Sequence, residues 1–198
     1  MKRTRGRPRQ YDEDAALQAA GEVFWTKGFS ATSLDDLTVA MGMNRPSIYR
    51  AFGDKETIYR KALMQFCQGM EVAFERTMLA EDDIRKALAS FYQDALAVYT
   101  SGEQPKGCLV MGTAVAAALC HPEIQADLLN VIRDLDHKIA KRLEQARDAG
   151  QLEASFDATG RAAVAQSLLH SLSVRARAGE APKRLMRMIE AGVETVVS

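Results

Sequence analysis

Residues 33–53, SLDDLTVAMGMNRPSIYRAFG, predict two short helices joined by a tight turn. The first helix begins at Ser33, where Ser33-x-x-Asp36 approximates a capping box with Asp in place of the usual Glu. Gly42 ends this helix and supplies the permissive backbone that a tight turn requires. The second helix, Asn44–Phe52, has Asn as its N-cap and a proline in its first turn, where a missing N–H costs little.

The second short helix has one face for the core and one for a partner. Ile48 and Phe52 anchor it, which leaves four side chains exposed: Arg45, Ser47, Tyr49 and Arg50. Two arginines, a hydroxyl and a tyrosine, with no acid, suit the major groove of DNA. Arginine can pair with both acceptors of a guanine edge, and serine and tyrosine can reach phosphates or a thymine methyl. The pattern indicates a helix-turn-helix; the alternative is a three-helix bundle that only caps a larger domain.

The rest of the chain also has a helical period, and strand signals are almost absent. A helix over residues 12–27 precedes the short pair, with Gly28 after its end, and Asp54 caps a long helix to about Arg76. Five more helices are expected, over residues 82–100, 108–120, 122–149, 157–178 and 182–197. The prediction is therefore an all-α fold of about nine helices. Its parts are a basic flexible arm (1–11), a helix-turn-helix DNA-binding domain (12–58) and a regulatory domain for ligand binding and dimerisation (59–198).

Composition places the chain among ordinary globular proteins. Of its 198 residues, 47% are hydrophobic and 26% charged, and no apolar run approaches the roughly 20 residues of a membrane span. No secretory signal is expected. The three cysteines are an odd number and form no Cys-x-x-Cys pair, which favours the reducing cytoplasm over a disulfide-bonded protein. In the cytoplasm the protein would associate with the nucleoid. The zero net charge hides an asymmetry, because residues 1–10 carry five basic side chains and no acid. Such an arm on an acidic body suggests contact with a polyanion.

Several motifs resemble the TetR family of transcriptional regulators. They are Lys27-Gly28-Phe29, residues 31–37 (ATSLDDL), Met41-Gly42-Met43 and residues 47–56 (SIYRAFGDKE). The sequence departs from the family at Thr38, where alanine is usual. The resemblance implies a dimer on double-stranded, palindromic operator DNA. It also implies that Thr32 or Ser33 and Lys55 contact phosphate, and the basic arm can reach into a minor groove. The candidate DNA contacts are Arg5, Arg7, Arg9, Thr32, Ser33, Asn44, Arg45, Ser47, Tyr49, Arg50 and Lys55.

The last two predicted helices are candidates for the dimer interface. The helix over 182–197 has apolar residues at helical spacing, and the helix over 157–178 is rich in small residues. In the TetR family, the corresponding helices of two protomers form a four-helix interface. The candidate interface residues are Leu168, Leu172, Leu185, Met188, Ile189, Gly192, Val193 and Val196. The alternative is that these residues only complete the protomer's own core.

The site that receives a signal is sought in the regulatory domain (59–198), among aromatic, sulfur-bearing and histidine side chains. The candidates for a ligand pocket or sensor are Phe66, Met70, Phe91, Tyr92, Tyr99, Cys108, Met111, His137 and His170. Cys108 stands at an expected helix start beside Lys106, which would lower its pKa and favour reaction with electrophiles. The alternative is an unreactive buried cysteine. Cys120-His121 has no further ligand cluster, so no metal and no cofactor are expected.

The leading hypothesis is therefore a dimeric repressor that a small molecule or the modification of a cysteine releases from its operator. One alternative is a general architectural DNA-binding protein without an inducer. Another is an enzyme, which the absence of a Gly-rich phosphate loop, a paired-carboxylate site and a nucleophile elbow disfavours. Activation rather than repression also stays open, because the sequence encodes binding and not promoter position.

Overall fold

The structure is a computed structural model, and it describes residues 12–198. These residues form helices and turns without a strand, which confirms the all-α prediction. The chain divides into two compact units at Ala62 and Leu63, inside the long helix α4 (Lys55–Phe74).

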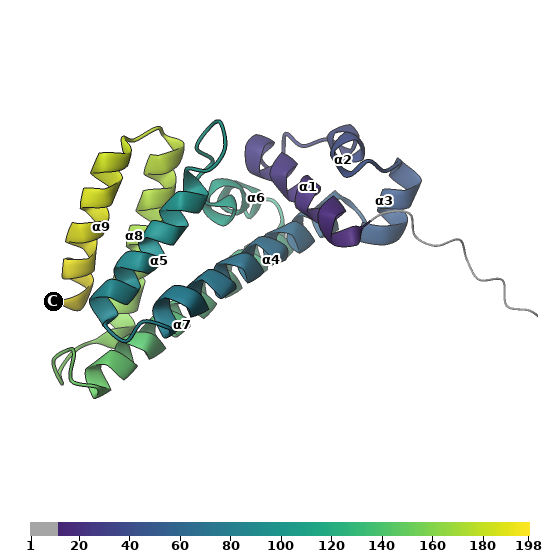
Figure 1. The fold of residues 1–198 in the computed structure, drawn as a ribbon. Helices are drawn as coiled ribbons and strands as arrows, with labels where there is room; N and C mark the ends of the chain where they lie inside the picture. Colours follow the sequence, from purple (N-terminus) through teal and green to yellow (C-terminus); the bar gives the residue numbers. More distant parts are fainter. Residues whose placement is uncertain (1–11) are drawn as a thin grey trace, which may run out of the picture. The chain divides into compact units, whose positions relative to one another are not determined.

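The first unit contains α1 (Glu13–Lys27), α2 (Leu34–Met41), α3 (Arg45–Phe52) and the start of α4 (Figure 1). Side chains cap the N-termini of α1 and α3. Asp12 accepts from N–H groups in the first turn of α1, and Asn44 Oδ1 accepts from the Ser47 N–H at 2.9 Å. Gly42 ends α2 in the left-handed region, with φ 61°, which lets the chain turn within a few residues. The two helices of the predicted helix-turn-helix thus have their expected bounds to within a residue.

Aromatic rings form the centre of the first unit. Phe24, Phe29 and Tyr59 are buried and meet one another with ring centres 5.1–6.2 Å apart. Leu37 of α2 and Ile48 of α3 are also fully buried, and α2 packs against both α1 and α3. The core therefore fixes α3 by its inner face, as the sequence predicts.

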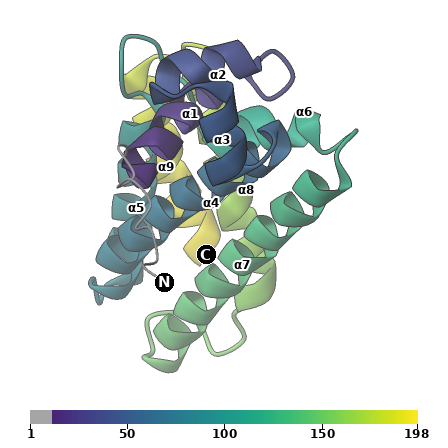
Figure 2. The same cartoon turned by 90° about the vertical axis from the view of Figure 1, so that its right-hand side faces the viewer.

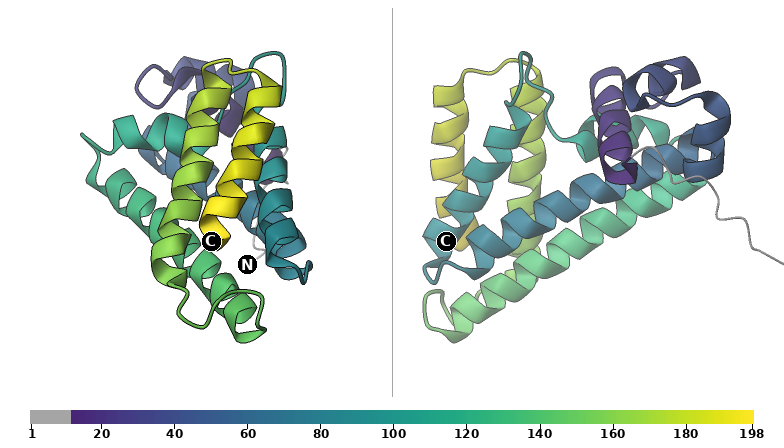
Figure 3. Two further views of the ribbon diagram at one scale, coloured as in Figure 1. Left: turned by 90° about the vertical axis from the view of Figure 1, so that its left-hand side faces the viewer. Right: turned by 45° about the vertical axis from the view of Figure 1, so that its right-hand side comes forward.

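The second unit continues α4 through a π-helical turn, η1 (Glu75–Leu79), into α5 (Ile84–Tyr99). It then contains a second π-helical turn, η2 (Val110–Ala114), and four α-helices: α6 (Val115–Ala117), α7 (Pro122–Asp148), α8 (Ala158–Arg177) and α9 (Pro182–Val197). Helix α8 packs against α7 on one side and α9 on the other, and α5 packs against both α8 and α9 (Figures 2 and 3).

The helix predicted over residues 108–120 is shorter than expected. Regular α-helix covers only α6, after the π-turn η2 and before a turn at residues 118–120. His121 is extended (φ −130°, ψ 94°), as a residue before proline prefers, so the chain leaves the helix ahead of Pro122. Within η2, a Cβ at Gly112 would lie 2.5 Å from Arg177 Nη1 of α8, so glycine permits this close approach.

A buried arginine holds the turn between η1 and α5. The Arg142 side chain on α7 is 7% exposed and donates from Nε to Met78 O at 2.6 Å. Its Nη2 donates to Glu81 O at 2.8 Å and Asp82 O at 2.9 Å. The guanidinium therefore donates to three carbonyls, one in η1 and two in the turn after it, and it ties this turn to α7.

Candidate nucleic-acid interface and ligand pocket

Helix α3 presents the exposed face that its sequence predicts. Ile48 is fully buried and Phe52 is 4% exposed, whereas Tyr49 is 49% exposed and Arg50 is exposed. Arg45 and Asn44 are also exposed, and Ser47 is half-buried at the N-terminal end of the helix. A short helix held by two apolar side chains, with basic and hydroxyl groups outward, has the form of a major-groove reading helix.

An acid from the neighbouring helix lies beside this face. Asp35 Oδ1 on α2 accepts from Arg45 Nη2 at 2.7 Å and Nε at 3.2 Å, and this hydrogen bonding raises the pKa of Arg45. Both side chains are exposed, so the pair contributes little to stability. Sequence reasoning about α3 alone missed Asp35, because the partner is ten residues away on another helix. The only signal was the pair of acids at the start of α2.

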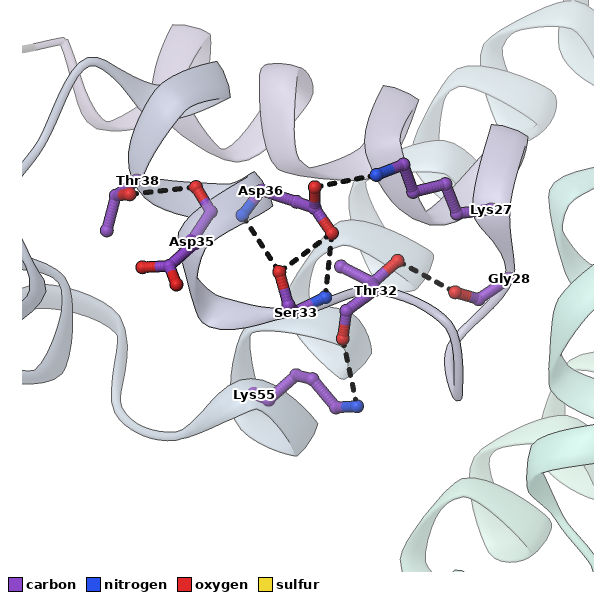
Figure 4. A network of polar contacts seen from close by, with 8 residues as sticks. All are labelled: Lys27, Gly28, Thr32, Ser33, Asp35, Asp36, Thr38 and Lys55. Carbon is purple, nitrogen blue, oxygen red and sulfur yellow. Dashed lines mark hydrogen bonds and ion pairs between the residues drawn. The ribbon is translucent and has the colours of Figure 1, made fainter.

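Ser33 and Asp36 form the predicted capping box at the start of α2 (Figure 4). Ser33 Oγ accepts from the Asp36 N–H at 3.1 Å, and Asp36 Oδ2 accepts from the Ser33 N–H at 2.9 Å. Lys27 Nζ of α1 donates to Asp36 Oδ1 at 2.6 Å. The hydrogen bond from Lys27, followed by those from Ser33, lowers the pKa of Asp36 to about 2. Asp36 therefore completes the capping box in place of the usual Glu, and its ion pair with Lys27 links α2 to α1.

Thr32 and Lys55 brace the segment before α2 (Figure 4). Thr32 is 2% exposed and its hydroxyl donates to Gly28 O at 2.7 Å, so of the two residues predicted to contact phosphate, Thr32 or Ser33, only Ser33 has an exposed side chain. Lys55 Nζ donates to Phe29 O and Thr32 O, both at 3.1 Å, and lies 4.5 Å from the Phe29 ring centre. An ammonium has three donors, and these two hydrogen bonds use two of them. Arg5, Arg7 and Arg9 lie outside the described residues.

Two family models match the chain. Residues 16–62 match the model of bacterial regulatory proteins of the tetR family, and residues 85–192 match the tetracyclin repressor-like C-terminal domain. The chain belongs to the TetR family. The predictions of this family and of a DNA-binding transcriptional regulator are confirmed, and the matched models describe regulatory proteins rather than enzymes.

TetR-family relatives match over almost the whole chain. The transcriptional repressor ComR of Escherichia coli (strain K12) is 28% identical over 189 residues, 95% of this chain and 90% of ComR. The regulator CifR, solved as a variant with two substituted cysteines on 26-base-pair operator DNA, is 31% identical. The two folds agree with a TM-score of 0.85 over 95% of this chain and 98% of CifR. A second CifR variant on the same length of operator DNA gives a TM-score of 0.86 at 31% identity.

The second unit of this TetR-family chain contains a cavity of about 460 Å³ between α4, α5 and α7. Its lining combines apolar side chains with an acidic and amide-bearing edge: Met64, Cys67, Gln68, Met70, Glu71, Phe74, Phe91, Asp127, Asn130, Val131, Asp134, Leu135 and Lys138. Two of the predicted pocket residues, Met70 and Phe91, line it. The polar edge was not predicted. In the sequence, an acidic residue of α7 that lines the cavity cannot be distinguished from an acidic residue that faces solvent.

Other predicted pocket residues have different roles. Tyr92 is fully buried and donates from its hydroxyl to Ala165 O at 2.9 Å, which commits it to α8. Phe66 and Met111 are half-buried, and neither lines this cavity. His137 lines a second cavity of about 650 Å³ between α7 and α8. Burial lowers the pKa of His170, which is half-buried on α8.

Within residues 12–198, no group of three or more metal-ligating side chains forms. No helix in this part of the chain is long and apolar enough to cross a membrane.

Cys108 has the opposite environment from the one predicted. It is 4% exposed, its N–H donates to Ser173 Oγ at 2.8 Å, and Tyr99, itself 1% exposed, hydrogen-bonds to its thiol. Burial raises the pKa of Cys108, although hydrogen bonds from the Met111 and Val110 N–H groups partly offset this effect. The predicted lowering of its pKa is therefore wrong, because desolvation outweighs the helix N-terminus.

Most residues predicted for the dimer interface complete the protomer's own core. Five of them are between 0% and 5% exposed: Leu172, Leu185, Ile189, Val193 and Val196. Leu168, Met188 and Gly192 are half-buried, and the Leu168 side chain packs directly over Gly192. The buried stripe of α9 faces α5 and α8. Helical periodicity therefore identified the apolar stripe of α9 correctly, but this stripe packs within the protomer and not against a second copy.

Proposed function

We propose that this TetR-family chain is a dimeric repressor that binds a palindromic operator and leaves it when an effector enters the second unit. The observation that carries the proposal is the exposed basic face of α3, fixed by Ile48 and Phe52 in a helix-turn-helix. The repressor ComR and the operator-bound structures of CifR support it. In this proposal the first unit binds DNA and the second is the regulatory domain.

The proposed base contacts come from Arg50 and Arg45, with Tyr49, Ser47 and Asn44 at phosphates or base edges. Arg45 must break its hydrogen bond to Asp35 before it can bind DNA, so Arg50 should provide the larger specific contact. Ser33 and Lys55 would approach phosphates from the N-termini of α2 and α4, where helix dipoles favour an anion. The arm with Arg5, Arg7 and Arg9 would reach the adjacent minor groove.

The proposed dimer interface lies on the outer face of α8. This face carries Val164, 42% exposed, and Val174, 61% exposed, with small or hydroxyl residues between them at helical spacing. Leu168, Met188 and Gly192 extend it toward α9. Two copies related by a two-fold axis would double the DNA contact and place two reading helices about 34–36 Å apart on successive major grooves.

The proposed effector site is the cavity between α4, α5 and α7, because its lining includes the C-terminal half of the helix whose start carries Lys55. A shift of α4 would then alter the spacing of the two reading helices. The alternative route, modification of Cys108, requires this buried thiol to become accessible.

The test begins by selecting bound duplexes from a random DNA library with the purified full-length protein, followed by footprinting. We expect a palindrome, and we expect Arg50→Ala to weaken specific binding about 10- to 100-fold because one bidentate base contact is worth roughly 1–3 kcal/mol. The matched control is Arg133→Ala, an exposed arginine of α7. Unchanged affinity in Arg50→Ala would overturn the assignment of α3. Binding without sequence preference would favour the architectural alternative.

A further inference from the structure

We propose that the cavity between α4, α5 and α7 takes a ligand with an apolar, aromatic body and a cationic head group, such as a protonated amine. This inference rests on the proposed function, since it names the chemical class of the effector.

The inner part of the cavity suits an apolar body. Phe74 and Phe91 are 5% and 2% exposed and meet edge to face with ring centres 5.5 Å apart. Met64, Met70 and Leu135 extend this surface. Thioethers adapt their shape to irregular guests, and about 460 Å³ is within the usual range for small-molecule sites.

The edge of the cavity is acidic even though it contains a lysine. Lys138 Nζ on α7 lies 2.7 Å from Glu71 Oε1 on α4 and 2.7 Å from Asp134 Oδ2 on α7. The hydrogen bonds that Lys138 donates to Asp134 first and Glu71 second raise the pKa of Lys138. One ammonium thus faces two carboxylates. Glu71 and Asp134 against Lys138 therefore give this edge a formal net charge of −1.

This charge balance selects between ligand classes. An anionic head group would meet the carboxylates of Glu71 and Asp134, and it could reach Lys138 only by displacing them. A cationic head group can instead bridge Glu71 and Asp134, because each carboxylate offers about four acceptor sites and Lys138 uses few of them. The amides of Gln68 and Asn130 supply further acceptors on the same lining.

The experiment compares three probes with the same body on the full-length protein by isothermal titration calorimetry: 4-phenylbutylamine, 4-phenylbutanol and 4-phenylbutanoate. We expect the amine to bind about 10-fold more tightly than the alcohol, and the carboxylate to bind most weakly, since partly exposed charge pairs are individually modest. Equal affinities for all three, or the reverse order, would overturn the proposed class. Failure of all three to bind would overturn it as well.

Variants locate the effect at the edge of the cavity. Glu71→Gln and Asp134→Asn should each weaken amine binding about threefold and leave the alcohol unchanged. Lys138→Met should strengthen amine binding, because it removes the competing cation. Glu153→Gln, an exposed acid in the turn between α7 and α8, is the matched control. All these side chains are at least partly exposed, so the variants should fold, which thermal unfolding verifies.

The head-group selectivity is measured without DNA, and release from the selected operator is measured separately. An amine that binds with the expected selectivity but leaves the operator complex intact supports the ligand class and contradicts the proposed release mechanism. Operator release by compounds that show no preference for the amine would contradict the ligand class alone.

Discussion

At the scale of single residues, burial decides the chemistry of the three cysteines. Cys108 is buried, Cys67 is half-buried in the cavity lining, and Cys120 is exposed. Desolvation raises the pKa of Cys67 to about 12 and also raises that of Cys108. Since the thiolate is the reactive form, both residues stay protonated at neutral pH and become reactive only as the pH rises.

We therefore predict that a thiol reagent such as Ellman's reagent modifies one thiol per chain quickly at pH 7.5. The other two should react at least about 100-fold more slowly, because so little thiolate is present. Cys120→Ser should remove the fast phase, and Cys108→Ser should leave it. A fast phase that is instead absent in Cys108→Ser would contradict the buried environment and restore Cys108 as a sensor.

At the scale of elements, two side chains that are distant in the sequence, Arg142 and Gln151, hold the junction between η1 and α5. Arg142 fills three carbonyl acceptors around the turn, and Gln151 Oε1 accepts from the Ile84 N–H at 2.9 Å while its Nε2 donates to Asp82 O at 2.8 Å. Both side chains reach over some sixty residues of sequence to the same turn. They fix the direction in which α5 leaves α4.

We predict that Arg142→Met lowers the free energy of unfolding by about 2–3 kcal/mol, because it removes the donor to the buried Met78 carbonyl and the donor to the partly buried Glu81 carbonyl. Urea unfolding followed by circular dichroism measures the change. Arg133→Met, on an exposed position of the same helix, should stay within about 0.5 kcal/mol of the parent protein. Equal stabilities of the two variants would show that the junction does not depend on the guanidinium.

At the scale of the whole molecule, the outer face of α8 explains a feature of its sequence. The helix has no single apolar stripe, because Leu169 and Leu172 face the core while Val164 and Val174 point outward. A helix with apolar residues on opposite faces normally packs on both. A second copy of the chain is the proposed partner of the outer face.

We predict that Val164→Arg shifts the protein from dimer to monomer in sedimentation at micromolar concentration, because a charge would be buried in the symmetric interface twice. Val72→Arg is the control, as Val72 is 63% exposed on α4. Both variants should retain their helical content. A dimer that persists in Val164→Arg would exclude this face as the interface.

The basic arm (1–11) also acts at the scale of the whole molecule, because its positive charges are distant in the sequence from the reading helix α3 but would bind the same DNA. Removal of residues 1–9 takes away five basic side chains and should weaken operator binding. It should also flatten the plot of log affinity against log salt, by about 0.9 for each phosphate that the arm neutralises. An unchanged slope in filter binding or fluorescence anisotropy, measured from about 50 to 200 mM salt, would show that the arm does not touch phosphates.

The sequence alone determined the helix-turn-helix and the helix order, because these depend on local chemistry. The Ser33–Asp36 capping box, the left-handed Gly42 and the N-cap Asn44 act within a few residues, and each has the predicted geometry. The anchors Ile48 and Phe52 follow from helical spacing, which also leaves Tyr49 and Arg50 outside. The family motifs lie in the same segment, so the class of function could also be predicted there.

Only the tertiary structure decided where each predicted face lies and which groups meet. Val193 faces the protomer's core, Cys108 is buried against Ser173, and Asp35 pairs with Arg45, although sequence spacing fits other outcomes. The acidic edge of the cavity joins Glu71 to Lys138, 67 residues apart. Helical periodicity shows that a face is apolar or charged but not what covers it, and desolvation and pairing, which set reactivity and ligand choice, depend on that covering surface.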